Sequence, residues 1–172
     1  MDYVPNDPHG HEIDSDPYFS LAADDDGVGF VRCGDGVLVV PLTEDGHVLL
    51  ALEHSPAFGF PQLGLVGGSL RPGERMERAA NRELQEELGW RAGRIAFLGE
   101  LRPWKYLTTR QFVFLARDLS PLRLPGDERY PVVERQVPLE RFLSLCAGGE
   151  LHDALAIAAL CLAREFLSHE GR

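Results

Sequence analysis

The apolar positions of the chain fall into short runs of β-branched and apolar residues, most of them bounded by Gly, Pro or Asp. Such runs predict strands at residues 28–40 and 48–52, and Asp45-Gly46 between them is a turn signal, so we expect a hairpin there. Further runs predict strands at residues 58–66, 93–101, 111–116 and 132–137. The pattern predicts a protein rich in strands.

Helical patterning interrupts these strands. From Glu74 onward the residues are good helix formers, and neither Pro nor Gly occurs until Gly89, so we expect a helix of about three to four turns. Its apolar residues recur every four positions and form a core-facing stripe: Met76, Ala80, Leu84 and Leu88. Pro138 opens a short helix, and residues 153–167 form a longer helix with an apolar face.

Residues 1–26 lack this patterning. They contain three prolines and a run of aspartates at residues 24–26, so we expect a flexible N-terminal arm ahead of one folded domain at residues 27–172. His9 and His11 have no third ligand nearby in the sequence. We therefore interpret them as part of a solvated arm rather than as a metal site.

The helix that follows Glu74 carries three acids close together. Glu83, Glu86 and Glu87 stand at spacings i, i+3 and i+4, which places their carboxylates on one face of the helix. Like charges this close repel one another, and a hard divalent cation would relieve the repulsion. Oxygen ligands without His or Cys favour Mg²⁺, with Mn²⁺ as a substitute, and suggest a phosphate-bearing substrate. The alternative is a solvated acidic surface.

Arg82 adjoins these acids, and Glu74 lies eight residues before it, near the start of the helix. An ion pair between the two would lock the preceding loop to the helix and orient Glu83. We therefore count Arg82 and Glu74 with the catalytic residues, in a positioning role.

Composition narrows the function classes. The chain has 172 residues and a formal net charge of −10, which argues against a general nucleic-acid binder and against anionic membrane surfaces. Its cysteines number three, without metal-ligand spacing, so we expect free thiols in a reducing compartment. We find no signal peptide and no long apolar run, and cytoplasmic location is the default.

A second candidate site lies between the predicted strands at residues 93–101 and 111–116. This loop contains Trp104, Tyr106 and Arg110 together with Lys105, the only lysine of the chain. These side chains could supply phosphate contacts and a stacking surface for a base. The alternative is an ordinary strand rim.

The segment from Gly68 to Trp90 resembles the Nudix box, G-x5-E-x7-R-E-U-x-E-E-x-G-U, in which U is a bulky apolar residue. Every fixed position is filled, by Gly68, Glu74, Arg82, Glu83, Leu84, Glu86, Glu87, Gly89 and Trp90. Trp90 is the one mild departure, because a smaller apolar residue is more usual there. The resemblance implies an α/β protein with the Nudix α/β/α sandwich and a mixed β-sheet, with residues 27–172 as the Nudix hydrolase domain.

The resemblance also implies a Mg²⁺-dependent hydrolysis of a nucleoside phosphoanhydride that releases a nucleoside monophosphate. Glu83 and Glu87, with Glu86 and the carbonyl of Gly67, would hold the metal that activates a water. Either Glu86 or Glu128 would take the proton of that water.

Glu128 is a candidate for this base because related enzymes often place a further acid in a loop like the one at residues 119–131. Asp127 and Glu134 compete with it for that role.

More local similarity points to the ADP-compound hydrolase and ADP-ribose pyrophosphatase branch, at residues 80–84, 126–128, 137–139 and 163–167. Relatives usually carry Glu where this chain has Gln62, a candidate substrate-binding residue, and residues 51–55 lack the usual Arg. The N-terminal strand pair through which relatives dimerise looks shortened, so a monomer and a homodimer both remain open. Free nucleoside di- or triphosphates and nucleoside diphosphate derivatives are alternative substrates, and a nucleotide-sensing domain without catalysis is a third alternative.

Overall fold

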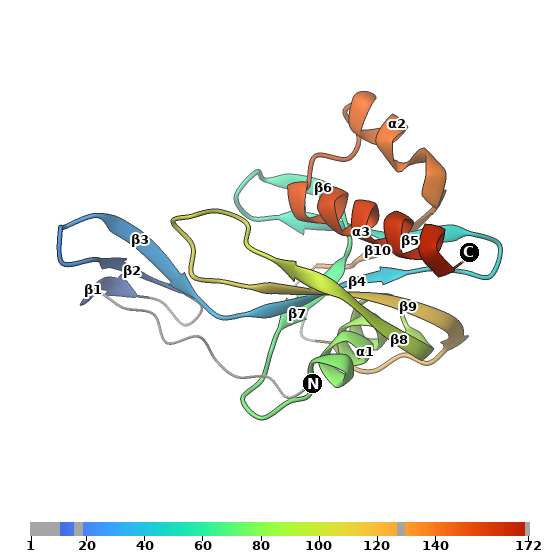
Figure 1. Ribbon diagram of the computed structural model, residues 1–172, viewed down its shortest axis with the longest axis horizontal. Coiled ribbons are helices and arrows are strands. Elements are labelled where there is room, and N and C mark those ends of the chain that lie inside the picture. The colour runs from blue at the N-terminus through green and yellow to red at the C-terminus, as the bar shows by residue number, and fades with distance from the viewer. Residues whose placement is uncertain (1–10, 16–18, 127–129, 171–172) are drawn as a thin grey trace.

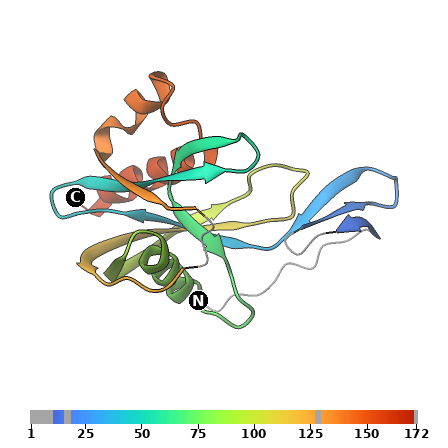
Figure 2. The same cartoon turned by 180° about the vertical axis from the view of Figure 1, so that it is seen from behind.

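The computed structural model describes residues 11–15, 19–126 and 130–170, and Figures 1 and 2 show its two opposite faces. The strands in these ranges are β1 (His11–Ser15), β2 (Phe19–Ala23), β3 (Gly29–Cys33), β4 (Gly36–Pro41), β5 (His47–Ser55), β6 (Phe60–Gly64), β7 (Val66–Ser69), β8 (Trp90–Leu101), β9 (Gln111–Pro121) and β10 (Val133–Pro138). The helices are α1 (Met76–Glu87), the 3₁₀ turn η1 (Leu139–Arg141), α2 (Phe142–Ala147) and α3 (Ala154–Glu170). None of these helices combines the length and apolar character needed to cross a bilayer.

The described strands form three sheets. In the sheet ordered β7-β4-β9-β8, strand β4 pairs antiparallel with β7 and parallel with β9, so this sheet is mixed. A second, antiparallel sheet has the order β10-β5-β6. The third, β1-β2-β3, extends away from the body of the molecule at the blue end of the chain in Figure 1.

Successive side chains of β4 enter two separate cores, as expected for a strand covered on both faces. Val37 packs in the core that contains Leu84 of α1, whereas Leu38 packs in the core that contains Leu160 of α3. The helices α1 and α3 therefore cover opposite faces of the strands (Figures 1 and 2). This arrangement confirms the predicted α/β/α sandwich with a mixed sheet.

Helix α1 ends where the sequence predicts. Gly89 follows it with a φ of 77°, a left-handed conformation that costs glycine little. The Arg123 guanidinium donates to the carbonyl oxygens of Glu86 at 3.1 Å and Glu87 at 3.3 Å. A cation at this end satisfies carbonyls that the helix leaves unpaired, so the last turn, which bears two of the acids, is fixed.

Some strand boundaries differ from the expected ones. The run at residues 28–40 contains two strands, β3 and β4, separated by Gly34 and Asp35, and the run at residues 58–66 contains β6 and β7. Each break redirects the chain from one sheet to another. The apolar pattern alone did not reveal these breaks, because apolar residues continue on both sides of them.

Strands also occur inside the segment assigned above to a flexible arm. β1 pairs with β2 and β2 with β3, so this chain has a three-stranded N-terminal sheet where a shortened strand pair was expected. Val31 of β3 joins this sheet to the rest of the protein, since its N–H donates to the Tyr106 carbonyl at 2.8 Å and its carbonyl accepts from Thr108 N–H at 3.0 Å. Pairing between these neighbouring strands, together with the link of Val31 to a segment distant in sequence, outweighs the weak local pattern. His11 begins β1, and His9 lies outside the described residues.

Candidate active site

The acids of α1 face strand β7, which carries the glycines of the predicted metal loop. Glu83 and Glu87 are only 6% and 3% exposed, and Glu86 is half-buried. The Gly67 N–H donates to Glu87 Oε1 at 3.2 Å. Buried carboxylates require partners to offset their desolvation, so the alternative of a solvated acidic surface does not fit Glu83 and Glu87.

Gly68 lies so close to Glu83 that a larger residue would not fit. A Cβ atom added to Gly68 would lie 2.4 Å from the carboxylate carbon of Glu83, well inside the contact distance of two carbon atoms. The glycine at this box position therefore lets the carboxylate of Glu83 approach the backbone of β7.

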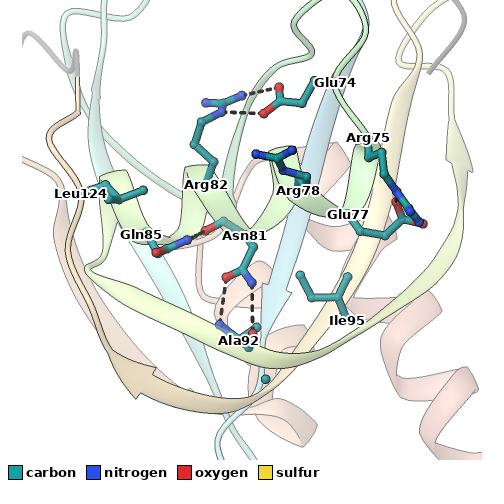
Figure 3. Close-up of a pocket in the computed structure, with 11 residues that line it drawn as sticks. Glu74, Arg75, Glu77, Arg78, Asn81, Arg82, Gln85, Ala92, Ile95 and Leu124 are labelled. Atoms are coloured by element: carbon teal, nitrogen blue, oxygen red, sulfur yellow. Dashed lines mark hydrogen bonds and ion pairs between the residues drawn. The ribbon is translucent and has the colours of Figure 1, made fainter. Parts of the chain in front are cut away.

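Arg82 is the most extensively paired cation of this site, where Arg71 Nη2 also lies 3.9 Å from Glu86 Oε1. Its Nε and Nη2 donate to the two carboxylate oxygens of Glu74, each at 3.0 Å, and Figure 3 shows this pair. Its Nη1 donates to Glu83 Oε1 at 2.6 Å and to Glu86 Oε2 at 3.0 Å, and Nη2 also reaches the Ser69 carbonyl at 3.2 Å. One guanidinium thus joins Glu74 and Ser69, which precede α1, to two acids of that helix; the expected pair of Arg82 with Glu74 is present, and the positioning role stays a prediction.

The pKa values of this cluster move in the direction that strengthens the pairing. Burial by itself would lower the pKa of Arg82, but the hydrogen bonds to Glu74 and Glu83 outweigh it and raise that pKa above its ordinary value. Burial would likewise raise the pKa of Glu74, but the Arg82 guanidinium lowers it below the ordinary value. Arg82 and Glu74 are therefore a charged pair at neutral pH.

The chemistry of the donors fits a hard divalent cation. The candidate metal ligands offer only oxygen atoms: the carboxylates of Glu83, Glu86 and Glu87 and the carbonyl of Gly67. The space beside Gly68 holds the Glu83 carboxylate and has no room for a side chain on Gly68 itself. Within residues 11–15, 19–126 and 130–170, no three His, Cys, Asp or Glu side chains are already gathered as a metal cage. Instead Glu83 and Glu86 accept from Arg82, and Glu87 accepts from Gly67.

The loop that follows β9 runs along the C-terminal end of α1. Leu122 N–H donates to the Gly89 carbonyl at 2.9 Å, and Leu124 N–H donates to the Gln85 carbonyl at 3.2 Å. A Cβ atom added to Gly126 would lie 3.5 Å from Glu86 Cβ, an ordinary contact distance. Gly126 directly precedes the predicted acids Asp127 and Glu128, which lie outside the described residues.

Glu134, the third acid considered for this loop, has other partners. Its Oε2 accepts from the indole Nε1 of Trp90 at 2.7 Å, and its Oε1 accepts from Gln136 Nε2 at 2.9 Å. Trp90 starts β8 and Glu134 lies in β10, so the bond joins two sheets. The unusual Trp90 of the box thus has a structural partner that sequence reasoning missed.

A groove of about 590 Å³ runs between α1 and β8 (Figure 3). Asn81 spans it: its Nδ2 donates to the Ala92 carbonyl and its Oδ1 accepts from Ala92 N–H, both at 3.0 Å. This paired contact fixes the middle of α1 to the edge of β8.

The side chains of the loop between β8 and β9 contact one another. The rings of Trp104 and Tyr106 meet edge to face with centroids 4.8 Å apart, and Lys105 Nζ lies 4.8 Å from the centroid of the Tyr106 ring. Trp104 is 59% exposed, so much of this residue is open to solvent. The loop also pairs with β3 through Tyr106, which ties it to the N-terminal sheet.

Arg110, for which a phosphate contact stays a prediction, pairs with an acid of the protein in this structure. Its guanidinium donates to Asp35 Oδ2 through Nε at 3.0 Å and through Nη2, and it lies 5.3 Å from the centroid of the Phe112 ring. Asp35 is 3% exposed. Sequence reasoning missed this acid, whose only local signal is its position between two glycines before a strand.

Gln62 lies in β6 opposite Glu53 of β5. It lines a cleft of about 530 Å³ together with His54, Phe58 and Asp153, among others. The His54 ring contacts the Tyr130 ring, with centroids 4.5 Å apart. Gln62 is therefore accessible from a cleft, as a substrate-binding residue must be.

Comparisons with known proteins identify the family of this chain. The family model of the NUDIX domain matches residues 34–164. The chain is 34% identical over 139 residues to the ADP compounds hydrolase NudE of Escherichia coli (strain K12), covering 80% of this chain and 74% of that protein. It is 39% identical over 71 residues to the nucleoside triphosphatase NudI of Salmonella agona (strain SL483), covering 40% of this chain and 48% of the relative. A crystal structure of an ADP compounds hydrolase matches with a TM-score of 0.80 and 30% identity, covering 99% of this chain and 97% of that one. The chain therefore belongs to the Nudix hydrolase family.

Proposed function

We propose that this Nudix hydrolase cleaves the phosphoanhydride of nucleoside diphosphate derivatives and releases a nucleoside monophosphate and a phosphorylated product. The observation that carries the proposal is the pair of buried carboxylates, Glu83 and Glu87, packed against Gly67 and Gly68 in a chain of this family. Likeness to an ADP compounds hydrolase over 80% of the chain makes ADP-ribose, NADH and dinucleoside polyphosphates the first candidates.

Free nucleoside di- and triphosphates are the second candidate substrates. The likeness to a nucleoside triphosphatase supports them, although it covers only 40% of this chain. Gln62 also favours them, since it stands where relatives of the ADP-compound branch usually carry an acid. An amide repels a terminal phosphate less than a carboxylate does.

The metal we propose is Mg²⁺, with Mn²⁺ as a substitute, held by Glu83, Glu87, Glu86 and the Gly67 carbonyl. The oxygen-only donor set supports a hard cation. Such an ion, when bound, neutralises phosphate charge and lowers the pKa of a coordinated water.

The protein's own residues supply orientation and a base. Arg82 and Glu74 hold the start of α1 against the loop and fix the side chain of Glu83. A carboxylate beside the water accepts its proton, and Glu86 and Glu128 are the two candidates. A Cβ atom added to Gly126 would contact Glu86, so the described end of this loop lies beside that acid.

The second moiety of the substrate has two candidate contact regions. Trp104 and Tyr106 offer a stacking surface for a base or nicotinamide ring, and Lys105 offers a charge for phosphate. Gln62, in the cleft beside β6, offers a donor and an acceptor for sugar hydroxyls.

The assembly and location we propose follow from the surface and the cysteines. Phe19, Leu21 and Val28 of the N-terminal sheet region are 54%, 44% and 47% exposed, which supports a homodimer over a monomer. Light scattering after size exclusion tests this point. The described structure contains three free cysteines and no disulfide among them, which supports the cytoplasm as the compartment. The net charge of −10 supports small nucleotides rather than nucleic acids as partners.

The experiment is a turnover panel with Mg²⁺. ADP-ribose, NADH and dinucleoside polyphosphates are compared with the common nucleoside di- and triphosphates, and the products are separated by charge. Release of AMP from ADP-linked compounds is the expected result. Preference for free triphosphates would favour the second candidate substrates, and binding of Mg²⁺ without turnover of any compound would favour a nucleotide sensor.

A further inference from the structure

Asp35 is a buried acid to which the proposed reaction assigns no step. It lies directly before β4 and is 3% exposed. Its Oδ1 accepts from the backbone N–H of Arg110 at 2.7 Å, and its Oδ2 accepts from the guanidinium of the same residue. An acid this buried is costly unless it is paired, and here both oxygens have charged or backbone partners.

The backbone around Asp35 joins three segments. Its carbonyl accepts from Leu70 N–H at 3.0 Å, directly after β7, and the N–H of Gly36 donates to the Arg110 carbonyl at 2.9 Å, directly before β9. The Asp35–Arg110 pair therefore holds the start of β4, the start of β9 and the end of the metal loop at one point.

From this point a stack of close contacts leads to the metal-binding acids. A Cβ atom added to Gly36 would lie 2.8 Å from Gln111 Oε1 and 2.9 Å from the Gly68 carbonyl oxygen. A Cβ atom added to Gly68 would lie 2.4 Å from the carboxylate carbon of Glu83. Gln111, Gly36, Gly68 and Glu83 thus follow one another with no room for an additional atom.

Contacts this tight transmit a displacement instead of absorbing it. Strand β4 pairs with β7 at Val37 and Gly68. If the start of β4 moves away from β9, the backbone of Gly68 in β7 therefore moves with it. The carboxylate of Glu83 then loses the surface on which it rests. A purely structural ion pair elsewhere in the sheet would have no such connection.

We propose that Asp35, clamped by Arg110, is a positioning residue that sets the place of Gly67 and Gly68 relative to Glu83 and Glu87. In this role Arg110 acts through Asp35. The inference rests on the proposed function in one respect, since it takes these carboxylates to be the metal ligands.

The experiment compares Asp35→Asn and Arg110→Lys with the wild type. Mn²⁺ affinity is measured by electron paramagnetic resonance on the unliganded protein, and kcat and KM are measured with the best substrate of the panel. We expect Asp35→Asn to weaken Mn²⁺ binding by about 10- to 100-fold, the range found when groups supporting metal ligands are removed, and to lower kcat with little change in KM. Arg110→Lys keeps the charge but loses the two-pronged geometry, so we expect a smaller loss of the same kind.

Two controls separate positioning from stability. Leu160→Ala removes buried volume from the core on the α3 side and lowers the melting temperature, yet should leave Mn²⁺ affinity unchanged. Gly34 and Gly36 flank Asp35, and only Gly36 is in close contact, so Gly36→Ala should reproduce the Mn²⁺ defect and Gly34→Ala should not.

Folded Asp35→Asn and Arg110→Lys proteins with wild-type Mn²⁺ affinity and kcat would overturn the proposal. So would an equal loss of affinity in Leu160→Ala. Because Mn²⁺ binding needs no substrate, the proposal is tested even if no compound of the panel is hydrolysed. A wild type that does not bind Mn²⁺ would overturn the metal site and the positioning role together.

Discussion

Arg82 Nη1 donates to Glu83 Oε1 at 2.6 Å, so the residue expected to orient this acid contacts it directly. The same nitrogen donates to Glu86 Oε2 at 3.0 Å, and the other side of the guanidinium binds Glu74. The positive charge among these acids is therefore the protein's own. A metal bound by Glu83 and Glu86 would share their oxygens with Arg82 or take its place.

This arrangement predicts a metal-dependent effect of Arg82→Gln. The Arg82 side chain is only 13% exposed, so removing its charge should cost about 3 kcal/mol, the low end for a buried pair. For a domain of this size that corresponds to about 6–12 °C in melting temperature. Mg²⁺ should restore part of the loss by supplying a cation to the acids. Thermal unfolding of the wild type and of Arg82→Gln, with EDTA and with excess Mg²⁺, measures the difference in melting temperature between the two proteins. The same difference under both conditions would contradict this prediction.

Gly68→Ala should disable the site although it adds only one methyl group. The new Cβ would clash with the Glu83 carboxylate at 2.4 Å, so that side chain must leave its place. We expect kcat to fall by at least about 100-fold, comparable to the loss of an important transition-state contact. Gly34→Ala is the matched control, since nothing lies within 4 Å of its Cβ position. Similar kcat values in the two variants would show that the close approach is unimportant.

The box helix could be predicted from sequence because its information is local. The helix formers after Glu74, the stop at Gly89 and the i, i+3 and i+4 spacing of the acids all act within a few turns, and the structure places α1 there. The pair of Arg82 with Glu74 was likewise accessible, because both lie on one loop and helix.

The part that was not predicted depends on partners far apart in the chain. Arg110 is an exposed cation as judged by its neighbours in sequence, and only the parallel pairing of β4 with β9 brings Asp35 to it. The backbone link of Val31 in β3 to Tyr106 and Thr108 is a tertiary effect of the same kind. Single-sequence patterns do not specify such pairings, because strand partners are chosen by packing rather than by local propensity.

The pKa of Glu74 predicts how stability depends on pH. Because Arg82 holds this pKa below its ordinary value of 4.5, the unfolded chain binds a proton before the folded protein does. The stabilisation by Glu74 is therefore complete above about pH 4.5 and is lost as the pH falls through the lowered pKa. Urea unfolding between about pH 3 and 6 should show a stability difference between the wild type and Glu74→Gln that shrinks on the acid side. A difference that is constant across this range would argue against the charged pair.

Glu87→Gln should separate chemistry from folding. The amide oxygen of glutamine can still accept from Gly67 N–H, so the contact between β7 and α1 remains. Loss of the negative charge should weaken metal binding and lower kcat by about 10²- to 10³-fold, since a bound metal supplies several kcal/mol of transition-state stabilisation. Initial rates with saturating Mg²⁺ and a melting curve check both halves of the prediction. The exposed Glu44 provides a control, Glu44→Gln, and full activity of Glu87→Gln would remove this residue from the site.

Variants of three of the candidate acids narrow the choice of general base. Both oxygens of Glu134 already accept from Trp90 and Gln136, which leaves this carboxylate engaged between β8 and β10. Glu134→Gln should therefore cost about 1–2 kcal/mol in stability through its hydrogen bonds but change kcat by less than about 3-fold. Removal of the true base should cost about 10²- to 10⁴-fold in kcat, and we expect that loss in Glu86→Gln or in Glu128→Gln. Rates of the three variants across pH distinguish them, because loss of the base also removes the acid limb of the kcat profile. If Glu134→Gln alone shows the large loss, then its bond to Trp90 must open during turnover, and the role assigned to Glu86 or Glu128 passes to Glu134.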